Sequence, residues 1–260
     1  MFLSKRVVIS MMAVLLLGSG CTENTTIPLP KDVVRITPLP TNTSTPSAPS
    51  APSTPSTRLA LVIGNGNYKG QQAFIGKLRF KKLDNPVNDA VDMAKVLRGL
   101  GFNVILKTDV ANRAAMKKAV QEFRQRLPED GRAVGLFYFS GHGFQHKNTN
   151  YLVPLRARMS SDIDIEDEAF NTDYVLRHLE KFNANGVNLI VLDACRDRIP
   201  EDFFEDRANK GFSDNLKAGF TQLQAPVGSL IAYSTAPDTT SWGGLPGERN
   251  SVYTKHLLTA

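Results

Sequence analysis

Two side chains that can perform covalent chemistry each follow an apolar run, and these are His142 and Cys195. The run AVGLFYF leads into SGHG, in which His142 stands between two glycines, and the run NLIVL leads into DAC, which ends at Cys195. Neither run alternates apolar and polar residues, which is typical of strands buried on both faces in a parallel sheet. Because open α/β sheets bind ligands at the carboxyl ends of their strands, we expect the two side chains to meet there.

A thiol beside an imidazole is an arrangement for nucleophilic catalysis. The imidazole of His142 promotes formation of the Cys195 thiolate and can later protonate the leaving amine of a peptide. The N–H groups of Gly143 and Cys195 would form the oxyanion hole. Three alternatives stay open: a buried filler cysteine, a histidine in a plain turn, and a metal site of His142, His146 and Cys195, which lacks a second cysteine or a helical histidine pair.

The composition narrows the classes of partner. The chain has 260 residues, a formal net charge of +6 and two cysteines, Cys21 and Cys195. The positive charge is spread along the chain with no basic run that carries interleaved aromatic residues, so we expect no nucleic-acid partner. Two cysteines make no disulfide framework, and if Cys21 is lipidated, Cys195 is left as a filler or a reactive thiol.

Residues 1–21 have the pattern of a lipoprotein-type signal peptide. Cationic residues precede the apolar run Val7–Leu17, and small residues lead into Cys21, which resembles a bacterial lipobox cysteine. The apolar run is too short to span a membrane with ease. Because Gly18 replaces the usual lipobox leucine, an ordinary secretory signal or an uncleaved anchor is the alternative. We expect lipid on Cys21 and, since Thr22 is not the retaining aspartate, an exported protein at the outer membrane that faces the periplasm.

The remaining chain divides into a tether and a domain. Residues 22–57 are expected to form a tether rich in Pro, Ser and Thr, and residues 58–260 a catalytic domain. Apolar runs and amphipathic segments alternate within the domain, which predicts an α/β fold in which a mostly parallel sheet lies between two helical layers. We expect strands at 58–64, 102–108, 133–139, 187–195 and 228–236, and helices at 85–101, 112–127 and 171–182.

The segments YFSGHG and DACRD together resemble the caspase-like cysteine peptidases, the clan of caspases, metacaspases and bacterial relatives such as orthocaspases. The resemblance extends to LALVIGNGNY, LDNPVNDAVDMAKVLRGLGF, NYLVP and SLIAYSTAPDTTSW, and so covers Arg58 to the end. It implies a caspase-like three-layer α/β/α sandwich with about six strands and a dyad of His142 and Cys195. It also implies hydrolysis of peptide bonds without a metal in the chemistry. The alternative function is a catalytically weak scaffold or binding lipoprotein at the cell envelope.

The residues near the cysteine predict a basic P1 preference. Asp193 is an anion beside the expected nucleophile, so it would repel an acidic substrate side chain and attract Arg or Lys. The resemblance to metacaspases, which cleave after Arg or Lys, adds Asp89 and Ser140 as substrate-binding residues. The pocket cysteine of that family corresponds to Pro86, so its contact is absent here. The alternatives are an Asp193 bonded to an arginine or a backbone donor and a solvated Asp89.

Several segments outside these motifs carry weaker predictions. We expect the acidic run Asp162–Glu168 to be a solvated loop, with a calcium site as the alternative, so calcium enters only as an activator and no cofactor is required. Trp242 either lines the substrate groove or covers the core. We expect Arg207–Gly211 to be a surface loop. The chain stops inside an expected helix where relatives continue, so either this version is short or a final strand is missing and a sheet edge or core face is exposed.

Overall fold

The computed structural model describes residues 57–68, 73–194, 203, 205–206, 209–213, 215–235 and 247–260. The predicted signal peptide, Cys21, the predicted tether except its last residue, Cys195 and Trp242 lie outside these residues, as do parts of the predicted Arg207–Gly211 loop. Thr57, the last residue of the predicted tether, is instead the first residue of the first strand. Residues Pro55–Thr259 form one compact unit. Within the described ranges, no helix has the length and apolar character needed to cross a membrane.

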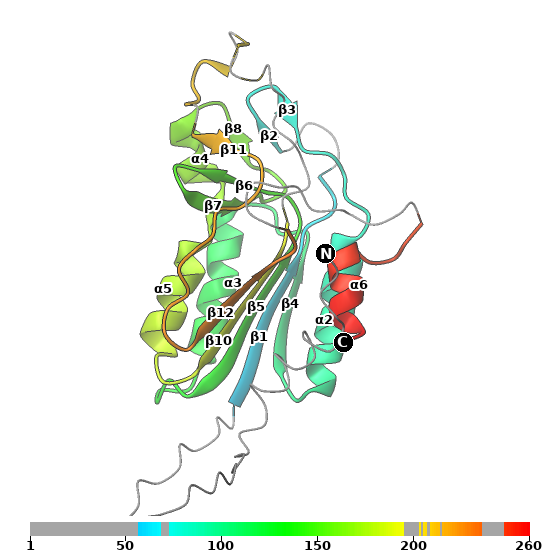
Figure 1. The fold of residues 1–260 in the computed structure, drawn as a ribbon, viewed down its shortest axis with the longest axis vertical. Coiled ribbons are helices and arrows are strands. Elements are labelled where there is room, and N and C mark those ends of the chain that lie inside the picture. The colour runs from blue at the N-terminus through cyan, green and yellow to red at the C-terminus, as the bar shows by residue number, and fades with distance from the viewer. Residues whose placement is uncertain are drawn as a thin grey trace, which may run out of the picture. The chain divides into compact units, whose positions relative to one another are not determined.

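A five-stranded parallel sheet forms the centre of this unit (Figure 1). Its strands are β1 (Thr57–Gly64), β4 (Asn103–Thr108), β5 (Ala133–Ser140), β10 (Val187–Asp193) and β12 (Ser229–Tyr233), in the order β12-β10-β5-β1-β4. Every neighbouring pair is parallel, and all eight residues of β5 are buried. Because β5 has side chains packed on both faces, its sequence shows no polar alternation. The predicted parallel sheet is confirmed.

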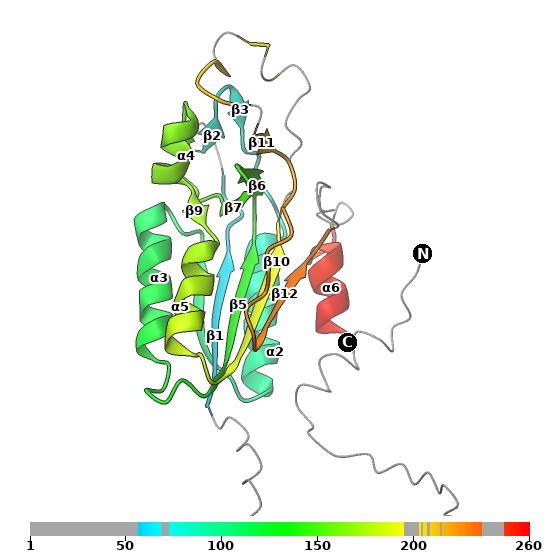
Figure 2. The ribbon, with the colours of Figure 1, turned by 60° about the vertical axis from the view of Figure 1, so that its left-hand side comes forward.

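Helices cover both faces of the sheet (Figures 1 and 2). The helices α2 (Pro86–Gly99) and α6 (Val252–Leu258) lie on one face, and α3 (Arg113–Gln125) and α5 (Asp173–Phe182) lie on the other. Successive side chains of a strand point to opposite faces, so Leu61 of β1 packs with the α3 and α5 layer, whereas Val62 packs with the α2 layer. The three-layer α/β/α sandwich predicted from the sequence is therefore confirmed.

Two small sheets lie beyond the carboxyl ends of the central strands (Figure 1). One contains β6 (Gly143–His146), β7 (Thr149–Leu152), β9 (Phe170–Asn171) and β11 (Leu216–Lys217), and the other contains β2 (Phe74–Ile75), β3 (Leu78–Arg79) and β8 (Arg158–Met159). The strand β6 begins directly after His142, so that residue stands between the central sheet and a small sheet.

The acidic run Asp162–Glu168 forms the short helix α4, so the prediction of a loop was wrong. Ser161 caps this helix by accepting a hydrogen bond from the Asp164 N–H, and carboxylates in a first turn interact favourably with the helix dipole. Burial raises the pKa of Asp162, but hydrogen bonds from Ser213 and the nearby His146 lower it by more, so the pKa lies below its ordinary value.

The helix α2 packs so closely on β1 that Gly64 has no room for a side chain. A Cβ there would lie 2.2 Å from the carbonyl oxygen of Pro86 and 2.7 Å from the Cβ of Ala90. We expect Gly64→Ala to lower the free energy of unfolding by about 1–3 kcal/mol because the core is overpacked. Gly99→Ala is the matched control: no atom lies within 4 Å of its added Cβ, and the change should stabilise the helix by about 0.5–1 kcal/mol. Urea unfolding measures the change in the free energy of unfolding for both variants. Equal changes would contradict the close packing of α2 on Gly64.

Candidate active site

The ends of β5 and β10, the two strands that precede the predicted site residues, lie side by side. Ser140 pairs in register with Asp193, and the N–H of Gly141 donates a hydrogen bond to the carbonyl oxygen of Asp193 at 3.2 Å. His142 follows Ser140 by two residues, and Cys195 follows Asp193 by two residues. The register places Ser140 and Asp193 side by side at the carboxyl ends of their strands, and Cys195 lies outside the described residues.

The imidazole of His142 is fully buried and held by three neighbours. The ring centroids of Tyr68 and Phe80 lie 4.6 Å and 5.1 Å from that of His142. The Nε2 atom lies 2.8 Å from the carbonyl oxygen of Lys81. Because a carbonyl oxygen only accepts hydrogen bonds, Nε2 carries the hydrogen of the neutral ring and Nδ1 carries the lone pair. Nδ1 is thus the atom that can take up a proton.

The backbone at His142 is fixed by hydrogen bonds to Tyr68 and Val153. Tyr68 Oη accepts a hydrogen bond from the His142 N–H at 3.3 Å and donates one to the carbonyl oxygen of Val153 at 2.8 Å. In return, the Val153 N–H donates to the carbonyl oxygen of His142 at 3.0 Å. The side chain that packs against the imidazole therefore also anchors its main chain.

The N–H of Gly143 points away from β7. Gly143 pairs with Leu152 in the antiparallel ladder of β6 and β7, and the bond from Val153 to the His142 carbonyl marks this as a non-hydrogen-bonded pair. An added Cβ at Gly143 would lie 2.6 Å from Cζ of Phe220, so a larger residue does not fit. Gly143 thus allows the Phe220 ring to approach closely, and its N–H points away from the ladder of β6 and β7.

The three residues predicted to bind substrate lie in one buried polar network. Ser140 Oγ donates a hydrogen bond to Asp89 Oδ2 at 2.9 Å, and Asp193 is the register partner of Ser140. All three side chains are fully buried. The structure therefore brings together Asp89 from α2 and Asp193 from β10, and the alternative of a solvated Asp89 is wrong.

Two hydroxyl residues of the last helical segment complete this network, and neither was predicted from the sequence. The Ser251 N–H donates to Asp89 Oδ1 at 2.9 Å, and Ser251 Oγ donates to Asp193 Oδ2. Thr254 Oγ1 donates to the same oxygen of Asp193 at 2.8 Å. Tyr138 Oη lies 2.5 Å from Thr254 Oγ1 and must donate, because the threonine hydrogen is already directed at Asp193.

The sequence contains only a partial signal for these residues. Ser251 is the N-cap of α6 and accepts a hydrogen bond from the Thr254 N–H at 3.1 Å, so the segment SVYT predicts a helix start. It does not reveal contact with carboxylates far away in the chain. Between these two residues, burial and the charge of Asp193 raise the pKa of Tyr253 to about 12.

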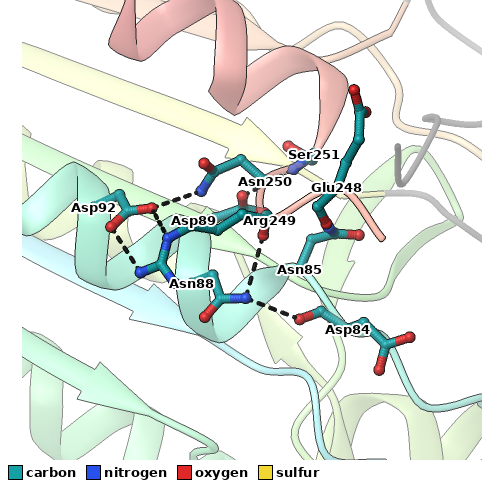
Figure 3. Close-up of polar contacts among 9 residues, drawn as sticks. All are labelled: Asp84, Asn85, Asn88, Asp89, Asp92, Glu248, Arg249, Asn250 and Ser251. Atoms are coloured by element: carbon teal, nitrogen blue, oxygen red, sulfur yellow. Dashed lines mark hydrogen bonds and ion pairs between the residues drawn. The ribbon is translucent and has the colours of Figure 1, made fainter. Parts of the chain in front are cut away.

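One polar stripe of α2 holds the segment that precedes α6 (Figure 3). Arg249 Nε and Nη2 donate to the two oxygens of Asp92 at 2.7 Å and 2.9 Å, and Asn250 Nδ2 donates to Asp92 Oδ2 at 3.0 Å. Asn85 Nδ2 donates to the carbonyl oxygen of Glu248 at 2.7 Å. We refer to these contacts of Asn85 and Asp92 with residues 248–250 as the α2 clamp, and they end immediately before Ser251.

The second histidine of the GHGFQH segment has a different partner. His146 Nε2 lies 3.0 Å from Asp162 Oδ1, so this buried imidazole contacts α4. Among the residues that the structure describes, no group of three or more His, Cys, Asp or Glu side chains could hold a metal ion.

The parallel sheet, its two helical layers and the buried imidazole at a strand end define a caspase-like α/β domain. The chain belongs to the caspase-domain family, because the model of the caspase domain matches residues 57–260. Membership of this family supports a cysteine-peptidase type of function.

Comparisons with individual proteins agree with this family. The chain is 29% identical over 145 residues to human mucosa-associated lymphoid tissue lymphoma translocation protein 1 and 28% identical over 145 residues to the mouse homolog. Each match covers 54% of this chain but only 15% of the relative. The crystal structure of protein GSU0716 from Geobacter sulfurreducens is similar with a TM-score of 0.54 and 21% identity, over 78% of this chain and 81% of that one. This last likeness shows the fold.

The α2 clamp makes stability depend on pH. The hydrogen bond from Arg249 lowers the pKa of Asp92 below its usual 3.8, although burial partly opposes this. A carboxyl group with a lowered pKa in the folded state stabilises the fold above its unfolded pKa, and the contribution is lost as the pH falls through the folded value. We therefore expect Asp92→Asn to be less stable than the wild type at neutral pH, with a difference that shrinks as the pH falls below 3.8.

Thermal unfolding of both proteins across the acid range tests this expectation. Addition of about 1 M salt at neutral pH should also reduce the difference, because exposed ion pairs are screened. A difference that stays constant with pH and salt would show that the charge of Asp92 contributes nothing.

Proposed function

We propose that this domain is a cysteine endopeptidase that cleaves peptide bonds after Arg or Lys, with Cys195 as nucleophile and His142 as acid and base. One observation carries the proposal: the paired ends of β5 and β10 are followed, at equal distance, by His142 and Cys195. The orientation of the imidazole supports the role of His142 as the base. Its Nε2 donates a hydrogen bond to a carbonyl oxygen, so the lone pair is on Nδ1.

The chemistry begins with proton transfer from the thiol. Nδ1 of His142 accepts the proton of Cys195, and the thiolate attacks the substrate carbonyl carbon. The N–H groups of Gly143 and Cys195 donate to the resulting oxyanion. When the intermediate collapses, the C–N bond breaks and the leaving amine takes the proton from His142. Water, deprotonated by His142, then hydrolyses the thioester and the thiol is restored.

The neighbours of His142 suit this cycle. The Lys81 carbonyl oxygen accepts a hydrogen bond from Nε2 in both charge states of the ring, and it stabilises the imidazolium because its dipole faces the positive charge. The rings of Tyr68 and Phe80 restrict rotation of the imidazole. These groups therefore orient Nδ1 without taking part in proton transfer.

The carboxylates of Asp89 and Asp193 support selection of a basic P1 side chain. The hydrogen bonds that they accept from Ser140, Ser251 and Thr254 come from hydroxyl and N–H groups, which hold a carboxylate in place without cancelling its charge. Two carboxylates in a buried site attract a cationic side chain and repel an anionic one. A guanidinium or ammonium group is therefore the proposed P1 ligand.

The proposal includes the location of the domain, which rests on the sequence alone. The lipobox-like Cys21 supports export followed by anchoring through an N-terminal lipid, at the outer membrane that faces the periplasm. The segment 22–57 would hold the domain away from the membrane surface. Calcium remains a proposed activator, and the proposed chemistry itself uses no cofactor.

Fluorogenic peptides that differ only at P1 test the specificity. We expect the full chain to cleave after Arg, with cleavage after Asp lower by at least about a hundredfold, since the two carboxylates attract one side chain and repel the other. Cys195→Ala should abolish cleavage, and Asp193→Asn should reduce the preference for Arg over a neutral P1. The assays are run with and without calcium. Cleavage after Asp would contradict the pocket, and absence of cleavage by the folded protein would favour a scaffold.

Thiol alkylation tests the proposed dyad without a substrate. In a Cys21→Ser background, Cys195 is the one remaining thiol, and we expect iodoacetamide to modify it rapidly near neutral pH. His142→Ala should slow the reaction by about tenfold or more, because the thiolate loses its partner. His178→Ala, on α5, is the matched control and should leave the rate unchanged. A rate equal to that of a model thiol in all three proteins would contradict the dyad.

A further inference from the structure

Ser251 connects the two carboxylates that the proposed function assigns to P1 selection. Its N–H donates to Asp89 Oδ1 at 2.9 Å, and its hydroxyl donates to Asp193 Oδ2. We propose that Ser251 is a positioning residue for P1 specificity, which sets the spacing of the Asp89 and Asp193 carboxylates that face a basic side chain. This inference rests on the proposed function, because it concerns the same pocket.

The need for such a residue follows from the charges. Asp89 and Asp193 are both fully buried, and like charges in a shared buried site repel each other. Ser251 gives each carboxylate one hydrogen bond and so binds the pair together without adding a positive charge. The net negative charge of the pair is thereby kept for the substrate.

The directions of the hydrogen bonds are determined by the groups involved. Asp193 accepts from the Ser251 hydroxyl, and Ser251 Oγ in turn accepts from the Thr254 N–H at 3.1 Å. Thr254 Oγ1 donates to the same oxygen, and Tyr138 donates to Thr254. Every hydroxyl in this series of hydrogen bonds therefore points toward Asp193, so loss of the Ser251 hydroxyl removes one hydroxyl donor to that carboxylate.

The main chain at Ser251 is held before any substrate arrives. The α2 clamp binds residues 248–250, and Asn88 Nδ2 adds a hydrogen bond to the carbonyl oxygen of Arg249 at 3.2 Å (Figure 3). Asp89 lies on the same stripe of α2 as the clamp residues. The Ser251 N–H thus reaches Asp89 from a fixed position, which is what a preorganised binding site requires.

The bridge has a specific consequence for arginine. A guanidinium binds carboxylates through two parallel N–H bonds in a fixed fork, whereas an ammonium is a point charge that tolerates displaced oxygens. Loss of the Ser251 hydroxyl should therefore weaken binding of a P1 Arg more than that of a P1 Lys. Binding of a peptide with citrulline at P1, a neutral analogue of arginine, should be weakened least.

Steady-state kinetics of the full chain on peptides with Arg, Lys or citrulline at P1 test the inference. For Ser251→Ala we expect kcat/KM on the Arg peptide to fall about tenfold, through KM, while kcat stays within about twofold. The preference for Arg over Lys and over citrulline should fall with it. Ser251→Thr keeps the hydroxyl and should restore the wild-type values.

Two further variants separate positioning from helix capping. Ser251→Gly also lacks the hydroxyl but costs a helix start only a few tenths of a kcal/mol, so it should reproduce the kinetics of Ser251→Ala in a more stable protein. Asn112→Ala removes the corresponding cap of α3, where Asn112 accepts from the Ala115 N–H at 2.9 Å. It should lower stability and leave P1 preference unchanged.

The outcomes distinguish this inference from the proposed function. If the wild type prefers Arg and Ser251→Ala keeps that preference, Ser251 only caps α6, and the inference is overturned while the proposed function stands. If Asn112→Ala shows the same kinetic loss, the effect is one of stability and the inference is likewise overturned. If the wild type shows no Cys195-dependent cleavage after Arg, the proposed function fails and the inference fails with it.

Discussion

The pairing of β5 with β10 is the interaction on which the site depends. These two central strands run parallel, and Ser140 and Asp193 face each other in the last paired position. A shift of one residue would turn every side chain of one strand to the opposite face. The apolar residues of β5 pack on both helical layers, as Phe137 and Tyr138 show, so burial fixes the register. The chemistry at the sheet edge is therefore aligned by the packing of the core.

The buried carboxylates are the part of the molecule that packing alone would not favour. A carboxylate removed from water is costly unless hydrogen bonds replace its hydration. Asp89 accepts from Ser140 and Ser251, and Asp193 accepts from Ser251 and Thr254. These hydrogen bonds replace part of the hydration that the two carboxylates lose on burial.

The central strands and main helices were predictable because each has a strong local pattern. The apolar run that ends before Ser140 lacks alternation, and His142 follows two residues after Ser140, so one short segment predicted both the strand and the position of the histidine. The acidic run Asp162–Glu168 was misjudged, because its charge concealed the Ser161 cap and the single buried residue Ile165. Ser251 escaped prediction for another reason: a helix cap is visible locally, but its carboxylate partners are brought to it only by tertiary packing.

The contact between Ser251 and Asp89 also bears on the order in which the molecule assembles. The two residues are 162 positions apart in the chain, and contacts of such separation require closure of a very long loop. Contacts of this kind form late in folding, because their entropy cost is met only when other structure is in place. The polar network of Asp89 and Asp193 therefore becomes complete only when α6 docks on α2. A partly folded chain in which α6 has not docked would hold the imidazole and both carboxylates but would lack the donors that Ser251 and Thr254 direct at them.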